Sequence, residues 1–220
     1  MYDLFRRNTK FNGHIELWDV SNVTNMAYMF SYSAFNKDIS EWDVSNVTTM
    51  SFMFSNSDFN GDLSKWDVSN VTTMDRMFSH SKFTGENGDI TGWDVSNVED
   101  MSFMFTHTKF NQPIGKWNIH NVRDISGMFG QTNYFNQDIS DWDIRNITGM
   151  STLFYCAKSF NKDLSKWDVS HVEDMNYMFY SAKSFNQDIS KWKINKACKT
   201  EDIFTNCPIK REYKPKMLKN

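Results

Sequence analysis

Apolar residues recur along the chain in a pattern that changes period inside every repeat of about 25 residues. Between Ile39 and Val44 the apolar residues are Ile39, Trp42 and Val44, and the polar Asp43 separates the last two. Such alternation is typical of a short, half-buried strand, and Trp and Val both suit a pleated surface. The pattern therefore predicts one short strand around the tryptophan of each repeat.

The apolar period lengthens to about three directly after this predicted strand. The apolar positions of the next segment are Val44, Val47, Met50, Met53 and Phe54. This spacing is typical of one face of a short α-helix or 3₁₀-helix. Ser45 or Asn46 is placed to cap the first N–H groups of that helix. The sequence therefore predicts one short helix per repeat as well.

Tryptophan marks the repeats most clearly. The eight tryptophans lie at positions 18, 42, 66, 93, 117, 142, 167 and 192, with spacings of 24 to 27 residues. Self-similarity with a period of this size is typical of solenoids, in which each repeat stacks on its neighbours. The longest repeat gains its extra residues at Thr84–Gly88, where Gly and Asn suit a surface turn, so we expect this insertion to leave the stack intact.

These patterns together predict an α/β repeat solenoid, a right-handed leucine-rich-repeat-like coil. Each repeat of 24–27 residues contributes one short parallel strand and one short helix. We expect a single domain over residues 1–207 and a basic capping or linking tail over residues 208–220. The segment Met1–Phe5 is already inside a repeat, so the chain starts mid-repeat and shows no polar N-terminal cap, which favours a piece of a longer protein.

Charge and composition narrow the function classes. The net charge is −3, and the tail from Pro208 carries +4, which leaves a mildly acidic −7 on the rest of the chain. An acidic body argues against a nucleic-acid-binding surface, which needs a basic face.

No apolar run approaches the ~18 residues of a membrane span, and the first residues do not have the pattern of a signal peptide. The three cysteines are too few and too scattered for a disulfide framework, although a Cys198–Cys207 bridge stays open.

Two motifs recur together in the repeats. They are Trp-Asp-Val-Ser-Asn-Val-Thr-x-Met-x-x-Met-Phe, as in residues 42–54, and Phe-Asn-x-Asp-Ile-Ser, as in residues 35–40. This combination closely resembles the BspA-like bacterial surface-protein repeat, which includes a lipoprotein repeat of unknown function from wall-less and host-associated bacteria. The resemblance covers residues 1–207 and implies a leucine-rich-like solenoid at a cell surface or secreted, with adhesion or protein binding as its role. The chain departs from the family by lacking a signal peptide and a lipidation cysteine.

The repeated aspartates invite a test for cation binding. One set comprises Asp43 and its equivalents, and a second set comprises Asp38 and its equivalents. Bound Ca²⁺ would relieve repulsion between stacked carboxylates, since hard cations take carboxylate oxygens. We favour local hydrogen bonds from backbone N–H groups and neighbouring Ser or Thr instead, because no Gly-rich calcium loop accompanies them. The sequence accordingly predicts no cofactor and no dependence of folding on Ca²⁺.

Three other recurring residue types have structural interpretations. The tryptophans share the parity of the buried valines, so we expect them in the core rather than on a ligand platform. The asparagines at 12, 36, 60, 111, 136, 161 and 186 predict a ladder that satisfies buried backbone groups between coils. His80 and His107 share one register, but two ligands do not make a metal site, so we interpret them as ordinary surface residues. No catalytic constellation stands out, and we expect no enzymatic activity.

Two functions remain, an interaction solenoid that binds a protein or glycan at a cell surface, and a structural spacer that projects another domain. A binder is expected to vary its exposed positions between repeats, and the variation rises in the fifth and sixth repeats. The predicted binding residues are Lys116, Asn118, His120, Asp141, Asp143, Arg145, Lys166 and Asp168. They are expected to form one surface across repeats five to seven, because equivalent positions of successive coils are neighbours.

Overall fold

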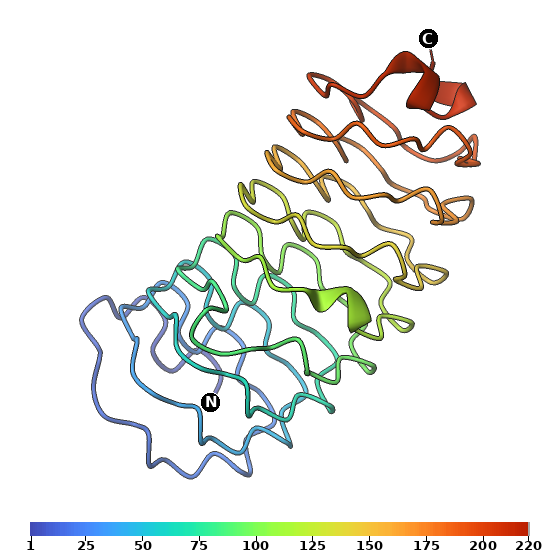
Figure 1. The fold of residues 1–220 in the computed structure, drawn as a ribbon. Coiled ribbons are helices and arrows are strands. Elements are labelled where there is room, and N and C mark those ends of the chain that lie inside the picture. Colours follow the sequence, from blue (N-terminus) through green and yellow to red (C-terminus); the bar gives the residue numbers. More distant parts are fainter. Residues whose placement is uncertain (220) are drawn as a thin grey trace.

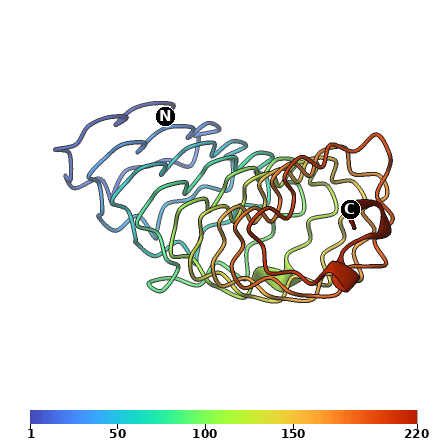
Figure 2. The same ribbon diagram turned by 90° about the horizontal axis from the view of Figure 1, so that it is seen from above.

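The computed structural model describes residues 1–219 and shows the repeats as a stack of coils, with the two termini at opposite ends (Figure 1). The coils follow one another in sequence order when the stack is seen from above (Figure 2). Isolated parallel bridges join equivalent residues of neighbouring coils, from Asn25–Thr49 at one end to Asp174–Lys199 at the other. One repeat of the sequence therefore forms one coil of the stack.

Regular secondary structure is almost absent from the coils. The described residues contain three 3₁₀-helices, η1 (Ile114–Lys116), η2 (Arg211–Tyr213) and η3 (Lys216–Leu218), and neither an α-helix nor an extended strand. The predicted α/β architecture, with one strand and one helix per repeat, is therefore wrong.

The segment predicted to be helical is a series of turns, because its N–H groups alternate between two kinds of partner. The N–H groups of Met50, Phe52, Phe54 and Asn56 donate to the carbonyls of Thr73, Asp75, Met77 and Ser79 in the next coil. The N–H groups of Met53, Ser55 and Ser57 donate three residues back, to Met50, Phe52 and Phe54. An α-helix would instead direct every N–H to the carbonyl four residues earlier. The apolar period of three comes from these turns.

Two residues of each such segment have left-handed backbone conformations. Phe52 has φ 56° and Asn56 has φ 55°, and the same two positions recur through the stack. A positive φ at the third residue of a turn is what a type II turn requires. This conformation costs roughly 1–2 kcal/mol for a residue with a side chain. The hydrogen bonds and packing between coils must offset that cost at every repeat.

The segment predicted to be a strand has the expected burial but not the expected pairing. Trp42 and Val44 are buried and Asp43 is exposed, as the alternation predicts. The backbone N–H of Trp42, however, donates to the Ile39 carbonyl of its own coil at 3.2 Å, not to a neighbouring strand. The Asn46 amide donates to the Ser21 carbonyl of the preceding coil at 2.8 Å and caps no helix.

The core runs through the whole stack as columns of like residues. Trp42, Trp66, Trp117 and Trp142 are all buried, which confirms their predicted place in the core. Each indole N–H also donates to a carbonyl of the preceding coil, as from Trp117 to Ile90 at 3.3 Å. Two columns of stacked phenylalanines fill the space beside them, as in the Phe54–Phe59 pair at 4.2 Å between ring centroids.

The insertion and the C-terminal tail are both fastened to the stack. The Gln112 amide donates to the Gly85 carbonyl at 2.7 Å, and the Thr73–Asp100 bridge continues the stack past the insertion, as predicted. Ile209 is part of the core, and the Ile189 N–H donates to the Tyr213 carbonyl of η2 at 3.1 Å. All three cysteines are free thiols, so Cys198 and Cys207 form no bridge.

Candidate functional site

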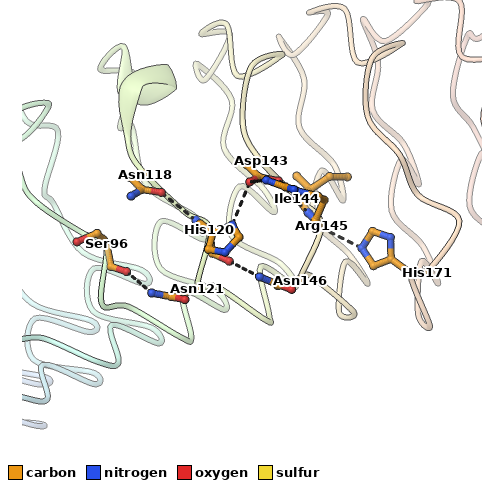
Figure 3. A network of polar contacts seen from close by, with 9 residues as sticks. All are labelled: Ser96, Asn118, His120, Asn121, Asp143, Ile144, Arg145, Asn146 and His171. Carbon is orange, nitrogen blue, oxygen red and sulfur yellow. Dashed lines mark hydrogen bonds and ion pairs between the residues drawn. The ribbon is translucent and has the colours of Figure 1, made fainter.

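The eight predicted binding residues flank the tryptophan column on coils five to seven. We call these residues, Lys116, Asn118, His120, Asp141, Asp143, Arg145, Lys166 and Asp168, the polar patch. They alternate with buried residues such as Trp142 and Ile144, so their side chains lie on the outside of the coils. Figure 3 shows the central part of the patch, where residues of neighbouring coils meet.

Asp143 is the centre of the polar patch. Arg145 donates to both of its carboxylate oxygens, from Nε at 2.8 Å and from Nη2 at 2.7 Å. The His120 imidazole approaches the same carboxylate from the preceding coil, with Nδ1 and Oδ2 3.0 Å apart (Figure 3). The hydrogen bonds from Arg145 and then from His120 hold the pKa of Asp143 far below its ordinary range. The carboxylate therefore stays charged, and bidentate pairing fixes the guanidinium plane.

A second ion pair lies in the same patch. Lys166 Nζ donates to Asp141 Oδ1 of the preceding coil at 2.9 Å, and this contact raises the pKa of Lys166. Both side chains are well exposed, and such pairs contribute only about 0–1 kcal/mol to stability. The ion pair between Lys166 and Asp141 therefore adds little to the stability of the fold.

The remaining members of the patch are less closely connected. Asn118 Oδ1 accepts the His120 N–H at 3.2 Å, which joins Asn118 to the central cluster. Asp168 instead accepts the N–H of Ser170 in its own coil at 3.0 Å. Lys116 is the last residue of η1. The structure therefore joins Asn118, His120, Asp143 and Arg145, pairs Asp141 with Lys166, and leaves Lys116 and Asp168 at the margin.

A column of side-chain amides holds the backbone beneath the patch. The Asn121 amide donates to the Ser96 carbonyl, and the Asn146 amide donates to the His120 carbonyl, both at 2.7 Å (Figure 3). His171 takes over the role in the next coil, with Nε2 3.0 Å from the Ile144 carbonyl. The sequence prediction missed this column because an Asn after Ser resembles a helix cap. The available signal was the recurrence of Asn four residues after six of the eight tryptophans.

The repeated aspartates accept hydrogen bonds from serine N–H and hydroxyl groups of their own coils, as predicted. Asp43 Oδ1 accepts the Ser45 N–H at 3.1 Å and the Ser45 hydroxyl at 2.6 Å, and these bonds lower the pKa of Asp43. Asp38 Oδ1 likewise accepts the Ser40 N–H at 2.9 Å. Within residues 1–219, no group of three or more His, Cys, Asp or Glu side chains is arranged to hold a metal ion.

The predicted asparagine ladder is present, but the backbone groups that it satisfies are exposed or half-buried rather than buried. The Asn60 N–H donates to Asn36 Oδ1 at 2.9 Å, and the Asn161 N–H donates to Asn136 Oδ1 at 3.0 Å. The ladder continues to the Lys210 N–H, which donates to Asn186 Oδ1 at 3.0 Å. Each asparagine thus links its coil to the next one.

His80 and His107 are both exposed, as the sequence predicts for surface residues, and they also contact one another. Their imidazole rings stack, with centroids 4.8 Å apart and planes 18° from parallel. Their shared register was visible in the sequence, but ring contact depends on the spacing of the coils and on side-chain conformation.

Stacked coils with continuous core columns and amide ladders define a repeat protein. The comparison with family models assigns it more closely. Residues 1–86, 80–192 and 106–214 match the family described as "Mycoplasma protein of unknown function, DUF285", and the chain belongs to this family. No curated protein and no solved structure matches the chain. Nowhere in residues 1–219 is there a helix of the length and apolarity that crossing a membrane requires.

Proposed function

We propose that this chain is a non-catalytic interaction module that binds a protein or glycan partner through the polar patch. The observation that carries this proposal is the convergence on Asp143. His120 and Arg145 both stand where five of the six other repeats have Ser, and both direct their side chains to the same carboxylate. The ladders beneath them already secure the backbone, so this cluster adds a surface feature that the stack does not need.

The cluster leaves donors for a partner. Arg145 carries five N–H groups, and only those on Nε and Nη2 face Asp143. Its side chain is 74% exposed. A guanidinium held by one carboxylate is oriented for planar acceptors such as the carboxylates of a protein or of an acidic sugar.

We propose a cell-surface or secreted location on the ground of the BspA-like resemblance. The same resemblance supports adhesion as the biological role. The polar patch carries both charge signs and no large apolar anchor, so we expect modest affinity. Binding should weaken with added salt, because exposed charges are screened over roughly 8–10 Å at physiological ionic strength.

The test reverses charge on the patch. The double variant Arg145→Glu/Lys166→Glu is compared with Lys65→Glu/Ser69→Glu, which changes the equivalent positions of an earlier coil. Protein and glycan arrays at low salt first identify a partner, and titration then measures its affinity for each variant. We expect the patch variant to lose at least about tenfold in affinity, the loss from one charged contact of ~1.4 kcal/mol, and the control to bind as the wild type does. Unchanged binding by the patch variant would remove the polar patch as the binding surface.

A spacer that projects another domain is the second candidate. The observation that favours it is that one core and one series of bridges between coils run from the first coil to the last. A spacer should show no partner on the arrays, and its function should survive the patch variant.

A further inference from the structure

A cavity of about 600 Å³ opens where the turns bearing His80, His107 and Gln131 lie side by side on successive coils. Pockets of roughly 300–1,000 Å³ are the usual size for small-molecule sites. Lys82, Lys109 and Tyr134 also line it, and no Asp or Glu among the described residues does so. The Tyr134 side chain is 54% exposed at its edge. The cavity thus combines hydrogen-bond donors, positive charge and one aromatic ring.

The two imidazoles each have one nitrogen already engaged. His80 Nδ1 lies 2.9 Å from the Ser79 hydroxyl, and His107 Nδ1 lies 3.2 Å from Gln131 Oε1. An amide oxygen only accepts, so His107 Nδ1 donates. These contacts fix both rings and leave both Nε2 atoms for a ligand. The rings are nearly parallel, so when protonated the two Nε2–H groups serve as neighbouring donors.

The charges around the cavity are incompletely balanced. Lys82 Nζ lies 2.7 Å from Asp58, whereas Lys109 has no ion pair within residues 1–219. Burial lowers the pKa of His80, and the nearby His107 lowers it further. Two protonated imidazoles 4.8 Å apart repel one another. An anion that bridges the two Nε2 atoms at the edges of the rings would offset this repulsion and pair with Lys109.

We propose that this cavity binds a sugar that carries a carboxylate. The carboxylate accepts from His80 Nε2–H and His107 Nε2–H and pairs with Lys109. The Gln131 amide and the Tyr134 hydroxyl form hydrogen bonds with the sugar hydroxyl groups. This role explains why the cavity is larger than a simple anion requires. This site is separate from the polar patch and does not depend on the proposed function.

The affinity of this site depends on pH in a defined direction. The other ionisable groups at the cavity are Lys82, Lys109 and Tyr134, together with Asp58, which faces Lys82. Among these residue types, histidine is the one whose charge ordinarily changes between pH 5 and pH 8. Because the ligand binds the protonated rings, its affinity should be about tenfold or more higher at pH 5.5 than at pH 8, a difference of ~1.4 kcal/mol or more in binding free energy.

Proton NMR of the imidazole C2–H resonances tests the proposal directly. The full chain is titrated at pH 5.5 and pH 8 with glucuronate, with sulfate and with glucose. We expect glucuronate to shift the His80 and His107 resonances saturably at pH 5.5, to bind more tightly than sulfate, and to bind weakly at pH 8. Glucose should cause no shift.

The matched variant is His80→Asn/His107→Asn. Asn56 occupies the equivalent left-handed position of an earlier coil, so this variant should fold, and its far-ultraviolet circular dichroism checks that it does. It should lose glucuronate binding by calorimetry, whereas the control His14→Asn in the first coil should retain it. The proposal fails if glucuronate causes no saturable shift, if glucose or sulfate binds equally well, or if the double variant still binds.

Discussion

Replacement of Trp117 tests how the core columns stabilise the stack. Its side chain is 4% exposed, its indole N–H donates to the Ile90 carbonyl, and its ring stacks on Trp93 at 6.5 Å. Truncation to Ala removes the ring from a packed column, which costs about 3–5 kcal/mol. In a chain of this size each kcal/mol lowers Tm by ~2–4 °C, so Trp117→Ala should lower Tm by roughly 6–20 °C.

Trp117→Phe separates the hydrogen bond from the packing. Phenylalanine keeps an aromatic ring but removes one of the two donors to the Ile90 carbonyl, which keeps the backbone N–H of Trp93 at 3.1 Å. The loss of the indole hydrogen bond should therefore cost only about 0.5–1.5 kcal/mol. Trp18→Phe is the control, because Trp18 begins the column and is 41% exposed. Thermal melts followed by circular dichroism compare the three variants. A Trp117→Ala protein that melts within about 2 °C of the wild type, less than the effect of 1 kcal/mol, would show that the column contributes little.

Two further substitutions test electrostatics and backbone strain. Burial raises the pKa of Asp100, and repulsion from Asp75 and Asp124 raises it further. The protonated Asp100 side chain therefore contributes its full stabilisation below pH ~4, and this stabilisation is lost as the pH rises through the raised pKa. Asp100→Asn should therefore melt above the wild type at pH 7 and together with it at pH 3, and equal melting at pH 7 would contradict this. Gly127→Ala places a Cβ 2.3 Å from the Phe103 ring at φ +61°, and should cost about 2–4 kcal/mol of unfolding free energy from overpacking and left-handed strain. Urea unfolding measures this loss of free energy. When Phe103 is already replaced by Ala, Gly127→Ala should cost only the ~1–2 kcal/mol of left-handed strain, and an unchanged cost would refute the clash with the Phe103 ring.

Burial and side-chain ladders could be predicted from the sequence because they repeat in register. The core position of Trp117, the local bonds of Asp43 and the link between Asn36 and Asn60 all follow from one rule. Equivalent residues of stacked repeats are neighbours, so each polar column must find partners in its own coil or in the next. The insertion at Thr84–Gly88 left the stack intact for the same reason, since it lengthens a turn.

The secondary structure could not be predicted because side-chain periodicity does not reveal where each N–H points. Val44, Val47 and Met50 have a spacing of three in a helix and equally in consecutive turns. The left-handed φ of Phe52 carries no sequence signal, since Gly or Asn would be expected there and most coils have neither. The same limit applies to the sites. The positions of His120 and Arg145 were predictable, but their convergence on Asp143 was not.

The alternating hydrogen bonds of the coil are the central structural claim, and a through-hydrogen-bond NMR coupling measures them most directly. We predict a coupling between the Phe52 amide nitrogen and the Asp75 carbonyl carbon, across the 2.9 Å contact between coils. A coupling from Phe52 to the carbonyl of Thr48, four residues earlier, would instead demonstrate an α-helix and contradict the stack of turns described here.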